Sequence, residues 1–113
     1  MTAWLSLLQR FSALILAPLV LVHLGLMVYA IGDGLTAAEI LERTRGSILW
    51  GAFYGLFVIA AAVHGPIGLR TVLAEMTPWH GKSLDLAMLA FGLALLGLGA
   101  RALLAVVLPG AAP

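Results

Sequence analysis

The sequence predicts an all-α membrane protein with three transmembrane helices and a short interfacial helix in the first loop. The chain has 113 residues, of which 63% are hydrophobic and 10% are charged, a more apolar composition than that of a water-soluble domain. Residues 11–32 and 46–69 contain no charged side chain, and a third apolar run, about 84–108, contains only Asp85 and Arg101. Because a bilayer core needs about 20 apolar residues per helix, three spans fit.

The expected helices cover residues 4–31, 48–76 and 84–108, and residues 1–113 are expected to form one transmembrane domain. The first apolar run is longer than the roughly 7–15 residues of a signal-peptide core, so it is interpreted as a retained span. In the loop after it, Thr36 precedes Glu39 by three residues, the spacing of a capping box. This predicts the short interfacial helix, whereas residues 77–83 predict a turn.

Composition excludes several kinds of chemistry. The absence of cysteine excludes thiolate metal ligation and an iron–sulfur cluster held by this chain, so a redox centre must use histidine. No glycine-rich phosphate loop is present to hold a nucleotide cofactor, and no basic tract indicates nucleic acid. Three basic residues lie toward each end of the predicted bundle, so charge does not orient the chain.

Two histidines, His23 and His64, fall inside predicted spans. An ionisable side chain inside a span is costly and usually functional. Small residues at Ala60, Ala61 and Gly68 leave a flat surface beside His64, which suits a planar ring. The alternative is that each imidazole hydrogen-bonds a neighbouring helix and serves packing alone; bulkier neighbours give this alternative more weight for His23.

The two histidines are predicted to lie at different depths. His23 is about 20 Å from Arg10 along its helix, and His64 is about 9 Å from Arg70 along the next. If both arginines mark the same interface, the imidazoles differ by about 10 Å in depth. We therefore predict that they do not ligate the same iron, so that each would need a second ligand from another chain.

Polar residues at the start of the first span indicate a pocket at the membrane surface. Ser6 and Arg10 share a helical face, Ser12 is near, and Arg70 reaches the same interface. Such a pocket suits an amphiphile with carbonyl oxygens, such as a quinone. The alternative is that both arginines only extend to lipid headgroups.

The segment "HGPIGLRTVLAE" resembles the second-helix haem motif of membrane anchor (cytochrome b) subunits of succinate dehydrogenase and fumarate reductase. The larger anchor chains carry His-x-x-x-Gly-Ile-Arg, and the smaller ones carry His-x-x-Ile-Gly followed by Val-Leu-x-Asp. The matching positions are His64, Ile67, Gly68, Leu69, Arg70, Val72, Leu73 and Glu75. The resemblance implies that His64 ligates haem b, with Gly68 and Arg70 beside the cofactor.

The start of the first span is similar to the family's Ser-x-x-x-Arg-x-Ser-Gly segment. The resemblance implies quinone contacts, which we expect from Ser6, Arg10, Ser12 and Glu75. Gln9 and Met76 stand where the family usually has histidine and tyrosine.

The position of His23 resembles that of a histidine in a different branch of the family, the five-helix anchors that hold two stacked haems. This chain is similar to one half of such an anchor. The resemblance implies one or two haems b per assembly, with His23 as a second iron ligand. Gly51-x-x-x-Gly55 would then form a contact face for a second copy or a similar anchor chain.

The resemblance implies a membrane anchor subunit of a succinate:quinone oxidoreductase, which is not catalytic alone. Quinone would be the substrate, and FAD and iron–sulfur clusters would reside on the flavoprotein and iron–sulfur subunits. The expected location is a bacterial-type inner membrane, multi-pass, with a cytoplasmic N-terminus. Two alternatives stay open: a haem-free anchor of the same complex, and a non-redox assembly or transport subunit that uses His23 and His64 as a proton relay.

Overall fold

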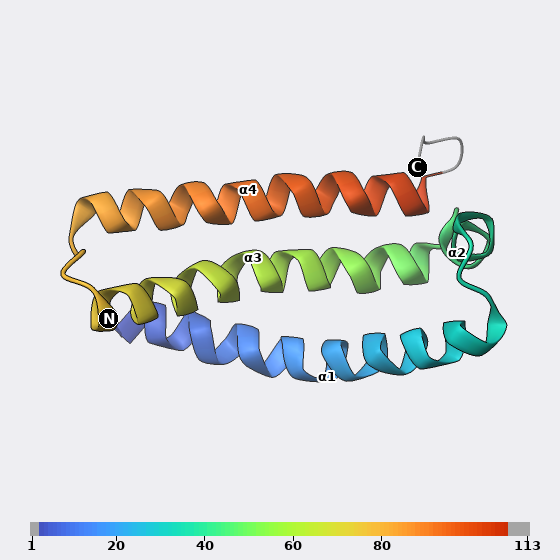
Figure 1. Ribbon diagram of the computed structural model, residues 1–113, viewed down its shortest axis with the longest axis horizontal. Helices are drawn as coiled ribbons and strands as arrows, with labels where there is room; N and C mark the ends of the chain where they lie inside the picture. Colours follow the sequence, from blue (N-terminus) through green and yellow to red (C-terminus); the bar gives the residue numbers. More distant parts are fainter. Residues whose placement is uncertain (1–2, 109–113) are drawn as a thin grey trace.

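The computed structural model describes residues 3–108, and within that range it contains four helices and no strand. They are α1 (Ala3–Asp33), α2 (Ala37–Thr44), α3 (Ile48–Met76) and α4 (Lys82–Val107). Helices α1, α3 and α4 run side by side in alternating directions with α3 in the middle, and α2 lies at the end of the bundle opposite the N-terminus (Figure 1). The predicted fold class is confirmed, and the predicted spans agree with the long helices to within two residues at each end.

The three long helices have the dimensions of membrane spans. They contain 31, 29 and 26 residues, which correspond to lengths of about 46, 43 and 39 Å. Each exceeds the hydrocarbon core of about 30 Å and reaches into the headgroup region. Most of their large apolar side chains are exposed on the outer surface. The protein is therefore a multi-pass membrane protein whose outer faces suit lipid or other membrane helices.

Two glycines allow α4 to approach α3 closely. A Cβ atom added to Gly99 would lie 2.6 Å from Val58 Cγ1. A Cβ atom on Gly92 would lie 3.3 Å from the carbonyl oxygen of Ala62 and 3.2 Å from Pro66 Cγ. Pro66 has no N–H to bond that carbonyl, and α3 continues through it. The carbonyl that proline leaves without its helical partner thus lies against the backbone of α4.

The Gly51-x-x-x-Gly55 face packs within the chain, which corrects the prediction that it contacts a second chain. A Cβ atom on Gly51 would lie 3.3 Å from Val107, and one on Gly55 would lie 3.6 Å from Leu103, both on α4. The spacing identified a packing face correctly. It did not identify the partner helix, which α4 supplies.

The predicted capping box begins α2. Thr36 is the N-cap, and its hydroxyl accepts a hydrogen bond from the Glu39 N–H at 3.2 Å. The Glu39 carboxylate accepts a hydrogen bond from the Thr36 hydroxyl at 2.6 Å. In the usual capping box this carboxylate accepts from the backbone N–H of the N-cap residue instead. Gly34 makes room for this carboxylate, since a Cβ atom there would overlap it.

Helix α2 also closes the end of α4. The Thr44 hydroxyl donates to the Val106 carbonyl at 2.7 Å, and the Gly46 N–H donates to the Val107 carbonyl at 2.6 Å. Carbonyls in the last turn of a helix have no partner within that helix. The interfacial segment therefore satisfies two carbonyls that would otherwise be left at the end of α4.

Candidate functional site

A polar contact joins α1 and α3 inside the span. His64 Nδ1 lies 3.3 Å from Ser12 Oγ, and these two residues are 52 positions apart in sequence. Ser12 is only 4% exposed and His64 is half-buried. Within residues 3–108, Ser12 and Thr44 are the buried polar residues, and only Ser12 lies inside a span. A hydrogen bond to a neighbouring helix is what we expect if the imidazole serves packing alone. The contact engages only Nδ1, however, and leaves Nε2 without a hydrogen bond from any described residue.

Gln9 occupies the surface that was expected to be open beside His64. Its Nε2 atom lies 3.1 Å from the position that a Cβ atom on Gly68 would take, so the missing side chain of Gly68 makes room for Gln9. Its Oε1 atom is buried and has no hydrogen-bond partner among the described residues. Gln9 stands nearly one helical turn before Ser12 on the α3-facing side of α1. The sequence carries a signal for this position, because Gln9 and Ser12 are three residues apart and so share a helical face.

Arg70 pairs with an acidic residue of α4. Its Nε atom donates to Asp85 Oδ1 at 2.7 Å, and the two side chains are 25% and 54% exposed. Arg10, by contrast, is exposed on α1 and lies two positions before Ser12, about 200° around the helix. It therefore points away from α3. The structure does not bring Arg10 and Arg70 together within one chain.

The other expected quinone contacts are also separated. Ser6 is half-buried and Glu75 is exposed near the end of α3. Ser12 is turned toward His64, away from the face that Arg10 presents. Arg10 is thus on the outer side of α1, apart from Ser12.

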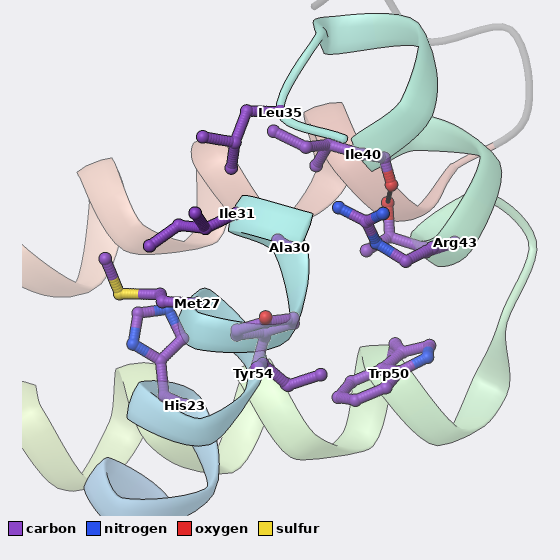
Figure 2. A pocket seen from close by; sticks show the side chains of 11 residues that line it. His23, Met27, Ala30, Ile31, Leu35, Ile40, Arg43, Trp50 and Tyr54 are labelled. Carbon is purple, nitrogen blue, oxygen red and sulfur yellow. Dashed lines mark hydrogen bonds between the residues drawn. The ribbon is translucent and has the colours of Figure 1, made fainter. Parts of the chain in front are cut away.

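His23 lies closer to the α2 end of the bundle and packs against two aromatic rings of α3. Its imidazole meets the rings of Tyr54 and Phe57 edge-on, at centroid distances of 6.0 and 5.7 Å. An apolar cavity of about 490 Å³ opens beside it, between α1, α2 and α3. Figure 2 shows His23 and Tyr54 on one side of this cavity and Arg43 of α2 on the other. Arg43 donates to Asp33 Oδ2 at 2.8 Å, so its guanidinium is paired.

The two intramembrane histidines lie at different depths, and the difference is larger than predicted. His64 is level with Ser12 on α1, and Ser12 precedes His23 by 11 residues, which corresponds to about 16 Å. The prediction of about 10 Å assumed that Arg10 and Arg70 are level. Because α1 and α3 are antiparallel, Arg70 is level with Ser6, about 6 Å from Arg10 along α1.

No chelating metal site is built by the part of the chain that the structure describes. No group of three or more histidine, aspartate or glutamate side chains converges there. His80 lies in the turn before α4, where its Nδ1 is 2.7 Å from the Pro78 carbonyl oxygen. His23, His64 and His80 thus lie apart from one another, each at its own level of the bundle.

Comparison with known proteins agrees with this architecture. Neither a curated protein nor a solved structure matches the chain. The family model of the succinate dehydrogenase/fumarate reductase transmembrane subunit, however, matches residues 1–100. That range contains α1, α2, α3 and most of α4, with both intramembrane histidines and the Ser12–His64 contact. The chain therefore belongs to the succinate dehydrogenase/fumarate reductase transmembrane subunit family.

Proposed function

We propose that this anchor subunit ligates haem b through His64 and helps to form the site at which quinone receives or gives up electrons. The observation that carries the proposal is an intramembrane imidazole held at Nδ1 by Ser12, with Nε2 free of hydrogen bonds from the described residues. An imidazole nitrogen without a proton is a common axial ligand of haem iron. The family match supports the anchor role over a non-redox assembly or transport subunit.

The residues present fit a haem held between two chains. When bound, haem b supplies a one-electron redox centre in the low-dielectric interior of the membrane. His64 would hold the iron through Nε2. Because His23 lies about 16 Å away along the bundle, the second ligand of the same iron would come from another chain, either a second copy or a similar anchor. His23, beside its own cavity, would ligate a second haem if the assembly holds two.

The cationic and polar groups near the N-terminal end would serve the substrate and the anionic edge of the cofactor. Arg70 would pair with a haem propionate in competition with Asp85, as charge-assisted hydrogen bonds allow. Ser6 and Arg10, which carry hydrogen-bond donors, would contact the quinone carbonyls, and Glu75 is a further candidate for the surroundings of the quinone. In this proposal FAD and the iron–sulfur clusters belong to partner subunits at a cytoplasmic N-terminal end, in a bacterial-type inner membrane.

The test is a dithionite-reduced minus oxidised spectrum of the gently solubilised complex, with haem quantified per anchor chain. We expect a b-type band that His64→Leu abolishes if the assembly holds one haem and reduces if it holds two. His80→Leu, which removes the histidine of the exposed turn, is the matched control and should leave the band unchanged. Partial loss in His23→Leu would indicate two haems, whereas full retention would remove His23 from the ligand set.

A second candidate, a haem-free anchor, is favoured by two observations. The imidazole of His64 already has a serine partner on the neighbouring helix, and Gln9 fills the space beside Gly68. In that case electrons would pass from the iron–sulfur subunit directly to quinone. A purified wild-type complex that reduces quinone but has no Soret band would establish this candidate and refute haem ligation.

A further inference from the structure

The Ser12 hydroxyl makes two contacts, one with His64 and one with a carbonyl of its own helix. The second contact limits the role that the hydroxyl can take toward His64. The hydroxyl donates to the Gln9 carbonyl oxygen at 3.0 Å, the backward bond that serine commonly makes within a helix. It also lies 3.3 Å from His64 Nδ1, at the long end of hydrogen-bond distances. The side chain is buried, so water does not compete for either position.

Counting protons assigns the direction of the second bond. A serine hydroxyl has one proton and two acceptor lone pairs. Its proton is directed to the Gln9 carbonyl at the shorter of the two distances, so toward His64 the Ser12 oxygen can only accept. Nδ1 must then carry the ring proton, and in a neutral imidazole the other nitrogen, Nε2, keeps its lone pair.

We propose that Ser12 is the positioning residue of His64, which selects the Nδ1–H tautomer and orients Nε2 as a ligand. This assigns Ser12 to the histidine, where the sequence had indicated a quinone contact. The relevance of the tautomer to iron rests on the proposed function, in which His64 ligates haem. A partner on the second ring nitrogen fixes the orientation of a ligating histidine and raises its basicity.

The contact itself is tested without haem. The full chain, labelled with ¹⁵N-histidine and held haem-free in detergent micelles, is examined by NMR, and the His64 signals are identified by their loss in His64→Leu. We expect a protonated Nδ1 and an unprotonated Nε2, with the ratio moving toward the Nε2–H form in Ser12→Ala. A wild-type His64 protonated at Nε2 would overturn the assignment.

The consequence for the cofactor is tested in the assembled complex. Loss of such a partner typically weakens binding about 10- to 100-fold, so Ser12→Ala should release haem correspondingly faster. Because a less basic ligand stabilises ferric haem less, we also expect a higher midpoint potential. The rise is about 59 mV for each tenfold loss of preference for the ferric over the ferrous state. Ser12→Thr, which keeps the hydroxyl, should restore both quantities toward wild type.

Thr71→Val is the matched control. Its hydroxyl bonds a carbonyl of its own helix, Ile67 O, at 3.1 Å, and not His64. If Ser12→Ala matches Thr71→Val in both haem release and potential, Ser12 has no positioning role, although haem ligation stands. If the wild-type complex holds no haem, the proposed function fails, while the NMR result still decides the Ser12–His64 contact. If the Ser12→Ala complex does not assemble, the Ser12→Thr complex tests the proposal instead. A Ser12→Thr complex that assembles without haem would contradict the positioning role of the hydroxyl.

Discussion

Replacing Gly99 with alanine is expected to disturb the contact between α3 and α4, because no space is left for a methyl group. A Cβ atom on Gly99 would lie 2.6 Å from Val58 Cγ1 and 3.0 Å from Val58 Cγ2. Nonbonded carbon atoms settle at about 3.5–4.0 Å. The helices must separate by about 1 Å at this point, or Val58 must leave its rotamer. Overpacking of this kind costs about 1–3 kcal/mol of unfolding free energy.

Gly97 provides the matched control on the same helix. A Cβ atom there would meet no atom within 4 Å. Both replacements gain the same helix propensity, about 1 kcal/mol, so this gain cancels when the two variants are compared. We expect Gly99→Ala to be less stable than Gly97→Ala by about 1–3 kcal/mol, which is about a 5- to 150-fold difference in the unfolding equilibrium.

The assay is unfolding of the full chain in mild-detergent micelles by titration with sodium dodecyl sulfate, followed by circular dichroism. Adding Val58→Ala to Gly99→Ala removes both clashing atoms and should recover part of the loss, which a double-mutant cycle measures. Equal midpoints for Gly99→Ala and Gly97→Ala would refute the packing argument.

Three further changes test the ends of the helices. Thr44→Val removes the buried hydroxyl that donates to the Val106 carbonyl and should lower the unfolding free energy by about 1–3 kcal/mol in the same titration. Asp85→Asn breaks the pair with Arg70, but because the Asp85 side chain is 54% exposed we expect a loss below about 1 kcal/mol that disappears in high salt. Thr36→Ala removes the N-cap of α2 and should cost about 1 kcal/mol, measured as faster hydrogen exchange of the α2 amides.

The control for Thr44→Val is Thr77→Val, which removes an exposed hydroxyl bonded to Leu73 O of its own helix. Equal stabilities of these two variants would contradict the role of α2 in closing α4. A salt-independent loss in Asp85→Asn would show that its pair with Arg70 is shielded from solvent. Unchanged exchange in Thr36→Ala would show that docking on α4, and not the cap, orders α2.

The elements of this protein could be predicted because their signals are local. A charge-free run long enough to cross a bilayer must form a helix, since no water is available there to bond an open backbone. The bounds of α3 match the prediction, and Ser47, which caps its first turn by accepting from the Trp50 N–H at 3.2 Å, marks its start. Thr36 and Glu39 mark the start of α2 in the same way.

What the sequence alone determined is thus the three spans, the interfacial helix and the two intramembrane histidines. Only the tertiary structure decided which residues meet, because helical periodicity defines a face and not the helix that covers it. Gly51 was assigned to a second chain for this reason, although it packs on Val107 of α4. Ser12 and His64, 52 positions apart, meet because antiparallel packing of α1 on α3 brings them to the same depth.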